Sequence, residues 1–313
     1  MKKIITLMFA VVLTFGGISV LTGKTIAGFK QRQYMLGPDM QFSPDGSKLA
    51  FIAKDGKKYY GPAYLYIGSS FKGNFSKIFP DPVDQYTWKN NNEIIYSVKE
   101  KDSVTVKSGN IKTRSSRVIF TKKLQMSGSG YARSYEKFEV KCISPDGNLM
   151  IVEKEKGACA IVQVSGQKET PLPGFTVPYS SNPQSTLKFS GNSKRLLLFD
   201  GKNRIYSVYD VSNSGLRLLK KIDTIKGITP GSDYLLNDRG DQIIFTQEKC
   251  KGGCYHIVYI YDLTSKKIYE NITIRSGQIL RVAFDRDFKN AVINDMHRRL
   301  MTFTLRKNGK EIK

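Results

Sequence analysis

An internal repeat constrains the fold of this chain more than any other feature. Six segments share one pattern, in which an aromatic or apolar residue is followed by a tight polar turn and then by an apolar-rich run. The residues that open these segments, called anchors below, are Phe42, Trp88, Ile143, Phe189, Leu236 and Phe284. Successive anchors are 46, 55, 46, 47 and 48 residues apart, and the long interval contains a Gly/Ser-rich stretch at 123–135 that lacks a strand pattern. A period of this length is typical of a propeller blade with four strands.

Each repeat reads as four short strands. The anchor ends an inner strand, and Ser43-Pro44-Asp45-Gly46 has the composition of a type I turn, which 144–147 repeats. A second strand follows, and the third strands, such as 205–211 and 257–263, alternate with period two. The fourth strands are more polar, as expected of outer edges. We therefore predict an all-β fold, a six-bladed β-propeller of four-stranded antiparallel blades.

The ends of the chain must close the predicted ring. Residues 310–313 are too few to form a complete outer strand for the last blade. We expect part of Phe29–Leu36 to complete that blade, with Asp39–Phe42 as the first inner strand.

The first 27 residues have the pattern of a secretory signal peptide. Lys2 and Lys3 form a basic start, residues 4–21 are mostly apolar, and Thr25-Ile26-Ala27 offers a small-x-small cleavage site. The predicted organisation is a signal peptide at 1–27 and a propeller at 28–313, in a periplasmic or secreted protein. The alternative is an uncleaved leader that tethers the protein to the membrane, because the apolar run is near the lower length limit for spanning a bilayer.

The Ser-Pro-Asp-Gly turns, and third strands reading IYSVYDV (205–211) and IVYIYDL (257–263), resemble those of the TolB-type β-propeller family. The resemblance covers about residues 37–313 and is carried by turn and core residues. It implies a six-bladed periplasmic propeller engaged in protein binding. We expect no counterpart of the family's α/β domain before the propeller, since only about 14 residues, 28–41, lie between the predicted cleavage site and the first anchor. The lipoprotein partner of TolB is therefore not carried over.

The chain has four cysteines, which for an exported protein permits disulfides. Cys250 and Cys254 flank a Lys-Gly-Gly turn that can join two hairpin strands, so we expect them to be bonded or close enough to bond. Cys142 and Cys159 fall on strands separated by a third, roughly 10 Å apart, and we expect free buried thiols. The spacing lacks zinc-ligand partners, so neither a metal site nor a cofactor is predicted.

No catalytic residues are predicted. A serine hydrolase needs a nucleophile elbow and a histidine base, and the chain has two histidines, His256 and His297, and no Gly-x-Ser-x-Gly motif. The aspartates at the predicted turns fit turn geometry better than catalysis. We expect a binding module rather than an enzyme. The alternative is a propeller hydrolase or lyase acting on an acidic glycan.

Charge is the informative functional feature. Lys and Arg number 50 against 27 Asp and Glu, a formal net charge of +23. An exported protein does not routinely meet nucleic acid, so the expected counterparts are an acidic envelope protein, an anionic polymer or lipid head groups. The excess of lysine could equally serve solubility. We expect a monomer.

Topology places this charge on one face. Loops between second and third strands leave one side of a propeller, and here their charges sum to +5, whereas the turns on the opposite side sum to zero. The predicted binding residues on the basic side are Lys57, Lys58, Lys202, Arg204, Lys251, Arg298 and Arg299. The sequence thus predicts an envelope module that binds an acidic protein or polyanion there.

Overall fold

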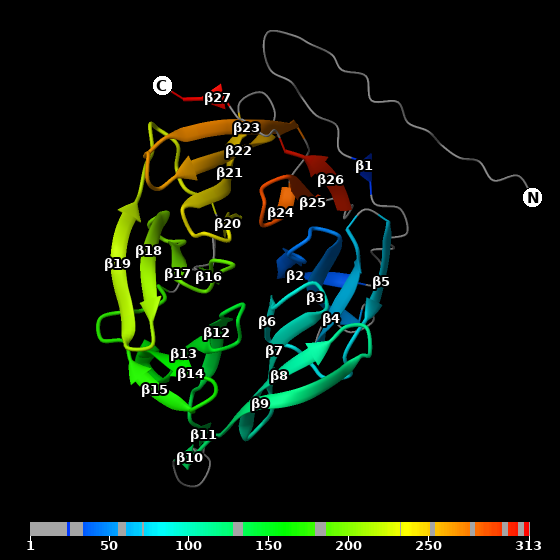
Figure 1. Cartoon of the computed structure of the whole chain (residues 1–313), viewed down its shortest axis with the longest axis vertical. Coiled ribbons are helices and arrows are strands. Elements are labelled where there is room, and N and C mark those ends of the chain that lie inside the picture. The colour runs from blue at the N-terminus through cyan, green and yellow to red at the C-terminus, as the bar shows by residue number, and fades with distance from the viewer. Residues whose placement is uncertain are drawn as a thin grey trace, which may run out of the picture.

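A computed structural model of the chain is a six-bladed β-propeller (Figure 1). The structure describes residues 24–25, 34–55, 61–70, 72–127, 134–178, 186–231, 233–250, 254–275, 279–295, 300–305 and 310–312. The sheets are antiparallel, and each blade runs from an inner strand at the axis to an outer strand at the rim. Among the described residues the only helical element is a 3-10 turn at Glu155–Gly157. The predicted fold class is confirmed.

The first three blades follow one another in sequence. Blade one contains β2 (Tyr34–Phe42), β3 (Lys48–Asp55), β4 (Ala63–Ser69) and β5 (Gly73–Lys77). Blade two contains β6 (Gln85–Trp88), β7 (Glu93–Lys99), β8 (Ser103–Asn110) and β9 (Ser115–Lys123). Blade three contains β12 (Glu139–Ile143), β13 (Leu149–Glu153), β14 (Cys159–Gln163) and β15 (Lys168–Pro171). Between blades two and three, a small hairpin of β10 (Met126–Ser127) and β11 (Ser134–Tyr135) occupies the stretch in which the sequence showed no strand, which corrects that interpretation.

The last three blades repeat this order. Blade four contains β16 (Thr186–Phe189), β17 (Arg195–Asp200), β18 (Ile205–Ser212) and β19 (Gly215–Ile222). Blade five contains β20 (Tyr234–Leu236), β21 (Gln242–Cys250), β22 (Cys254–Asp262) and β23 (Ile268–Arg275). Blade six contains β24 (Ile279–Phe284), β25 (Asn290–Asp295) and β26 (Leu300–Thr304).

All six anchors end the inner strands of their blades, as predicted, and all are buried. Six apolar clusters fill the spaces between neighbouring blades, one for each interface. In β7, for example, Ile94 and Tyr96 pack towards blade one, and Ile95 packs towards blade three. The middle strands are therefore apolar on both faces, which is the pattern of a sheet covered on both sides.

The closure of the ring differs from the prediction. The outer strand of blade six is β1 (Lys24–Thr25), which pairs with β26, while Tyr34–Leu36 begin the inner strand β2 and pair with β3. The expectation that 29–36 would complete the last blade is therefore wrong in its residues, although the N-terminal part of the chain does supply the strand. The C-terminal β27 (Lys310–Glu311) adds to β23 and makes blade five a five-stranded sheet.

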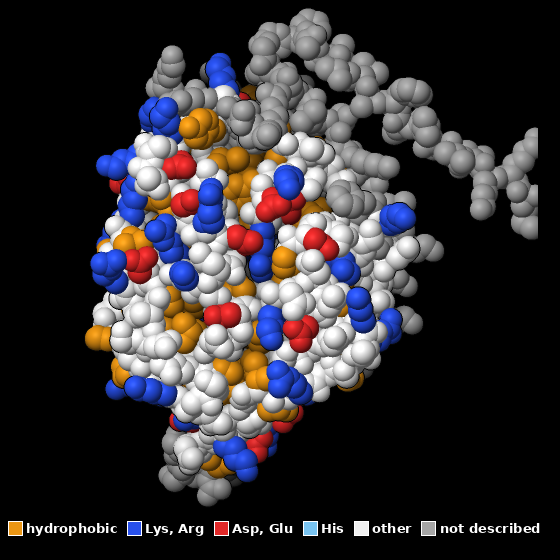
Figure 2. Space-filling view, in the orientation of Figure 1, with side chains coloured by type: hydrophobic (Ala, Val, Ile, Leu, Met, Phe, Trp, Pro, Cys, Tyr) orange, Lys and Arg blue, Asp and Glu red, His pale blue; other side chains and the backbone are white. Residues whose placement is uncertain are grey.

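The connections divide the propeller into two faces. Because successive strands are antiparallel, every turn between the first and second strands of a blade lies on one face, called the turn face. Every connection between second and third strands lies on the other, called the hairpin face. Viewed along the axis, Lys and Arg side chains are interspersed with Asp and Glu over the surface (Figure 2).

Candidate functional site

Hydrogen bonds tie the turn face into a ring. The buried hydroxyl of Ser144 accepts the backbone N–H of Leu149 at 2.9 Å and lies 2.6 Å from Asp146 Oδ1, and Ser43 and Ser190 repeat this arrangement. Asparagine and aspartate side chains occupy the same position in blades five and six. The Ser-Pro-Asp-Gly motif therefore supplies hydrogen-bond partners for the backbone of a tight, buried turn. Its aspartates have a structural role.

The turns also bind to one another. The N–H of Asp45 donates to Asn91 Oδ1 at 3.0 Å, and the N–H of Asp146 donates to Ser193 Oγ at 3.1 Å. Between blades four and five, the N–H of Asn192 donates to the carbonyl of Asp238 at 3.0 Å. Each bond joins residues one repeat apart, so the sequence period is also the spacing of contacts around the ring.

The central pocket lies within this ring. All six inner strands line it, and it encloses a cavity of about 80 Å³. One water needs roughly 10–15 Å³ of such space, so the cavity holds a few waters. The cavity is therefore too small to enclose a large ligand.

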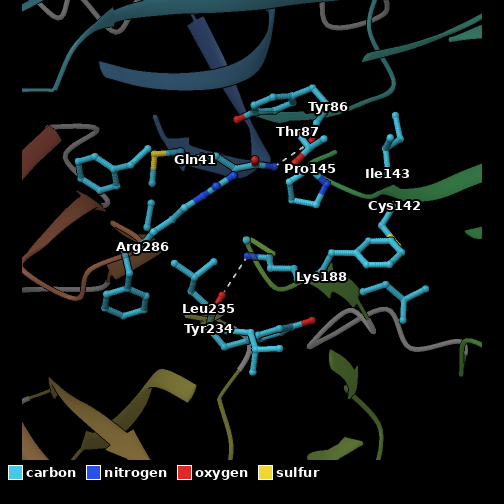
Figure 3. Close-up of a pocket in the computed structure, with 18 of the residues that line it drawn as sticks. Gln41, Tyr86, Thr87, Cys142, Ile143, Pro145, Lys188, Tyr234, Leu235 and Arg286 are labelled. Carbon is cyan, nitrogen blue, oxygen red and sulfur yellow. Dashed lines mark hydrogen bonds between the residues drawn. The ribbon is translucent and has the colours of Figure 1, made fainter. Parts of the chain in front are cut away.

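Polar side chains in the pocket are bonded to neighbouring blades (Figure 3). Gln41 Nε2 donates to the carbonyl of Tyr86 at 3.0 Å, and Lys188 Nζ donates to the carbonyl of Tyr234 at 3.1 Å. These contacts join blade one to two and blade four to five. The pocket thus uses its amide and ammonium groups for internal contacts.

Arg286 reaches furthest across the axis (Figure 3). It follows β24 in blade six, and its guanidinium donates to the carbonyl of Trp88 in blade two at 2.9 Å. Its Nη1 lies 3.6 Å from Asp238 Oδ1 in blade five. Burial raises the pKa of Asp238, and the nearby Arg286 opposes this rise. Arg286 was not predicted as a site residue, since an arginine in a polar turn gives no sequence signal for a contact 198 residues away.

A second charged group lies near the start of the inner strands of blades five and six. Arg281 Nη1 is 4.0 Å from Asp233 Oδ1. Burial raises the pKa of the Asp233 carboxyl, while Arg281, Lys188 and the N–H of Val282 act in the opposite direction. The acid is therefore held by cations from blades four and six.

Blades two and three carry a network of lysines and glutamates. Glu153 bonds to Lys137 and to Lys141, the latter at 2.8 Å, and Glu169 bonds to Lys154 at 2.7 Å and Lys122 at 3.3 Å. Burial would raise the pKa of Glu153, but the hydrogen bonds from Lys137 and Lys141 outweigh it and hold that pKa below its usual range. Glu136 lies 3.9 Å from Lys122, and Glu139 lies 3.1 Å from Lys141. The four lysines and four glutamates therefore balance, and the network adds little to the field of the protein.

Most cations in the first-to-second turns have partners. Of seven Lys and Arg residues in the first-to-second turns, six bond to a neighbouring group, and Lys194 is the exception among the described contacts. Arg239 and Lys289, for example, lie 3.2 and 2.8 Å from aspartate oxygens. The first-to-second turns therefore leave few cations without a partner.

The hairpin face differs in this respect. Five exposed cations there show no side-chain bond or ion pair to any described residue: Lys101, Lys156, Lys202, Arg204 and Lys249. Asp200 accepts the N–H groups of Lys202 and Asn203, and Glu155 accepts that of Lys137. These acids bond to the backbone and form no described ion pair with the five cations, so the side chains of the five cations stay exposed to solvent.

Two of the predicted binding residues, Lys202 and Arg204, lie exposed on the β17–β18 hairpin. Lys57, Lys58, Lys251, Arg298 and Arg299 lie outside the described residues. Three unpredicted cations, Lys101, Lys156 and Lys249, share the hairpin face with them. The loop position of these residues was visible in the sequence, but their lack of partners was not.

The cysteines follow the strand arrangement. Cys250 is disulfide-bonded, and it faces Cys254 across the β21–β22 ladder. Cys142 and Cys159 are free and buried, on strands separated by β13, as expected. Burial raises the pKa of both thiols, so they are poor nucleophiles.

His256 is buried beside this hairpin, with Nε2 3.7 Å from Glu248 Oε1. Burial lowers its pKa, and Glu248 opposes that shift. In the part of the chain that the structure describes, no three His, Cys, Asp or Glu side chains are grouped to hold a metal ion.

The comparison with solved structures supports the fold. No family model matches the chain, and no curated protein matches it in sequence. TolB from Acinetobacter baumannii is similar in structure, with a TM-score of 0.51 and 14% identity over 86% of this chain. This chain spans 66% of the length of that TolB chain.

Two further solved structures are similar at lower scores. The Pseudomonas aeruginosa periplasmic gluconolactonase PpgL has a TM-score of 0.48 and 16% identity, over 88% of this chain and 84% of its own. The Myceliophteria thermophila Cps50 (Swd1) β-propeller domain has a TM-score of 0.46 and 10% identity, over 86% and 83%. The chain therefore has a TolB-like six-bladed propeller fold. No helix in the described part of the chain is long and apolar enough to cross a membrane.

Proposed function

We propose that this chain is an exported TolB-like propeller that works as a binding module of the cell envelope, and that it recognises an acidic protein or anionic polymer through its hairpin face. The observation that supports this proposal is a contrast between two sets of connections. Six of the seven cations in the first-to-second turns have internal partners, whereas the side chains of five exposed cations on the hairpin face have none among the described residues. The net charge of +23 gives the whole chain an attraction for acidic surfaces.

The binding should depend on salt. Exposed charges separated by more than about 8–10 Å are largely screened at physiological ionic strength, and the cations come from hairpins of several blades. Attraction at long range mainly accelerates association. We therefore expect the association rate to fall as salt rises, with a smaller change in dissociation.

A matched pair of double variants tests the face. Lys202→Glu with Arg204→Glu reverses two charges on the hairpin face, and Lys194→Glu with Arg239→Glu reverses two on the turn face. Poly-L-glutamate serves as the probe, with affinity measured by fluorescence anisotropy at low salt. We expect the hairpin variant to bind about tenfold more weakly and the turn-face variant to change by less than about threefold. Equal weakening would indicate attraction to net charge alone, and weakening only by the turn-face variant would place the interface on the other side.

Two further experiments test whether the protein is an enzyme and whether it is exported. The protein is incubated with acidic glycans, and new reducing ends or unsaturated products are measured. Turnover would replace the binding proposal with a propeller hydrolase or lyase. Fractionation of a bacterial host that expresses the full chain should recover the protein with the periplasm. Recovery from the cytoplasm would contradict export.

A further inference from the structure

The outer strand of blade six comes from a segment that the sequence pattern assigned to the leader. Lys24 pairs with Thr302, and Thr25 pairs with Met301, both antiparallel. In the described chain β1 is the only strand on the outer edge of β26, because β27 pairs with β23 instead. Removal of residues 1–27 would therefore remove the strand that completes the ring.

The register shows that this pairing belongs to the fold. In blades three, four and five, the last residue of the outer strand pairs with the second residue of the third strand. These pairs are Pro171 with Ala160, Ile222 with Tyr206 and Arg275 with Tyr255. In blade six, Thr25 ends β1 and pairs with Met301, the second residue of β26. The N-terminal strand therefore has the position and the register of the outer strands in blades three to five.

From this we propose that the mature chain retains Lys24 and Thr25, and that signal peptidase cleaves the leader between Ser19 and Val20. The inference rests on export, which is part of the proposed function. Between Phe15 and Lys24, Gly17-Ile18-Ser19 is the one segment with small residues at both positions that the peptidase reads. The apolar segment that remains, Ile4–Phe15, has a length within the usual 7–15 residues.

The mature chain should retain β1 because β26 would otherwise have an unpaired outer edge. Without β1 the outer N–H and C=O groups of β26 would face water or another chain, and an open edge of this kind invites intermolecular pairing. Cleavage after Ser19 leaves residues 20–23 ahead of the paired residues and keeps the edge covered. Cleavage after Ala27 leaves blade six with three strands.

The experiment is N-terminal sequencing of the full chain after expression and recovery from the periplasm. We expect the mature protein to begin at Val20. A periplasmic protein that begins at Gly28 would overturn the inference and leave export intact. A chain in the cytoplasm that keeps its leader would overturn export and this inference together, and an exported but uncleaved chain would overturn the cleavage site alone.

Two leader variants make the assignment specific. Ser19→Leu places a large side chain at the proposed site, and we expect processing to fall about tenfold. Ala27→Leu is the matched control at the other candidate site, and we expect normal processing. The opposite result would show that cleavage occurs after Ala27.

The role of the strand is tested in the mature protein itself. Thr25→Pro puts a residue without an N–H group into β1 and disfavours strand pairing there, while Thr25→Val keeps the N–H group and suits a strand. We expect the proline variant to melt about 4 °C lower and to exchange the amide protons of residues 300–304 about tenfold faster, with the valine variant unchanged. If both variants match the parent protein, β1 does not close the ring.

Discussion

The two faces of the propeller use the same kinds of residues for opposite purposes. On the turn face, charged and hydroxyl side chains bond to the backbone of their own turn or of the next blade, as Ser144 and Arg286 do. On the hairpin face, Lys202 and Arg204 project from a turn held by Asp200, and their side chains have no described partner. A polar residue that completes buried hydrogen bonds stabilises the fold, whereas an exposed cation contributes little to stability and remains available to a partner.

The comparison of the two faces predicts the largest loss of unfolding free energy for a substitution at a turn-face glycine. Gly147 and Gly174 both have left-handed φ values, of +77° and +72°. A Cβ on Gly147 would lie 2.3 Å from Ile95 Cδ1 of the neighbouring blade, while one on Gly174 meets nothing within 4 Å. We expect Gly147→Ala to cost about 3 kcal/mol and Gly174→Ala about 1 kcal/mol, because only the former adds a clash to the backbone strain. Urea unfolding measures both, and equal costs would show that the turn ring tolerates expansion.

The next effect is at the buried turn serine. Ser144→Ala leaves the N–H of Leu149 without its side-chain acceptor inside the fold. We expect a loss of about 2 kcal/mol of unfolding free energy. The matched change on the hairpin face is Asn203→Ala, which removes an exposed bond to Asp200, and it should cost below about 1 kcal/mol. A larger cost for Asn203→Ala than for Ser144→Ala would contradict the structural role that we assign to the turn face.

The lysine–glutamate network predicts a dependence on pH. The folded-state pKa of Glu153 is depressed, so its contribution to stability is present above its unfolded pKa, near the usual glutamate value of 4.5, and is lost as pH falls through the folded value. Glu153→Gln should therefore destabilise the protein at pH 7 and reduce its loss of stability between neutral and acid pH. Thermal unfolding of both proteins across pH 3–7 measures this, and parallel curves would contradict it.

The smallest effect is expected where the charges are exposed. The double variant of Lys202 and Arg204 to Glu should change unfolding free energy by less than about 1 kcal/mol, because exposed charges contribute little to folding. Chemical denaturation of the variant and the parent protein measures the difference. A loss above about 2 kcal/mol would mean that these side chains have structural partners.

The sequence alone determined the repeat and its local consequences. The number of anchors gives the number of blades, and their spacing gives four strands to a blade. The turn after each anchor ends the inner strand, because strand length, turn chemistry and alternation are local properties. The hairpin of Cys250 and Cys254, and the separate strands of Cys142 and Cys159, result from the same register.

Only the tertiary structure decided which residues meet across the ring. The bond from Arg286 to Trp88, the two-residue closure of blade six by β1 and the place of β27 on blade five join segments remote in sequence. A lysine in an exposed loop also looks the same in sequence whether an acid neutralises it, as Glu169 does Lys154, or leaves it free, as at Lys202. These contacts depend on the closure of the ring, and closure is a property of the whole chain that no local pattern records.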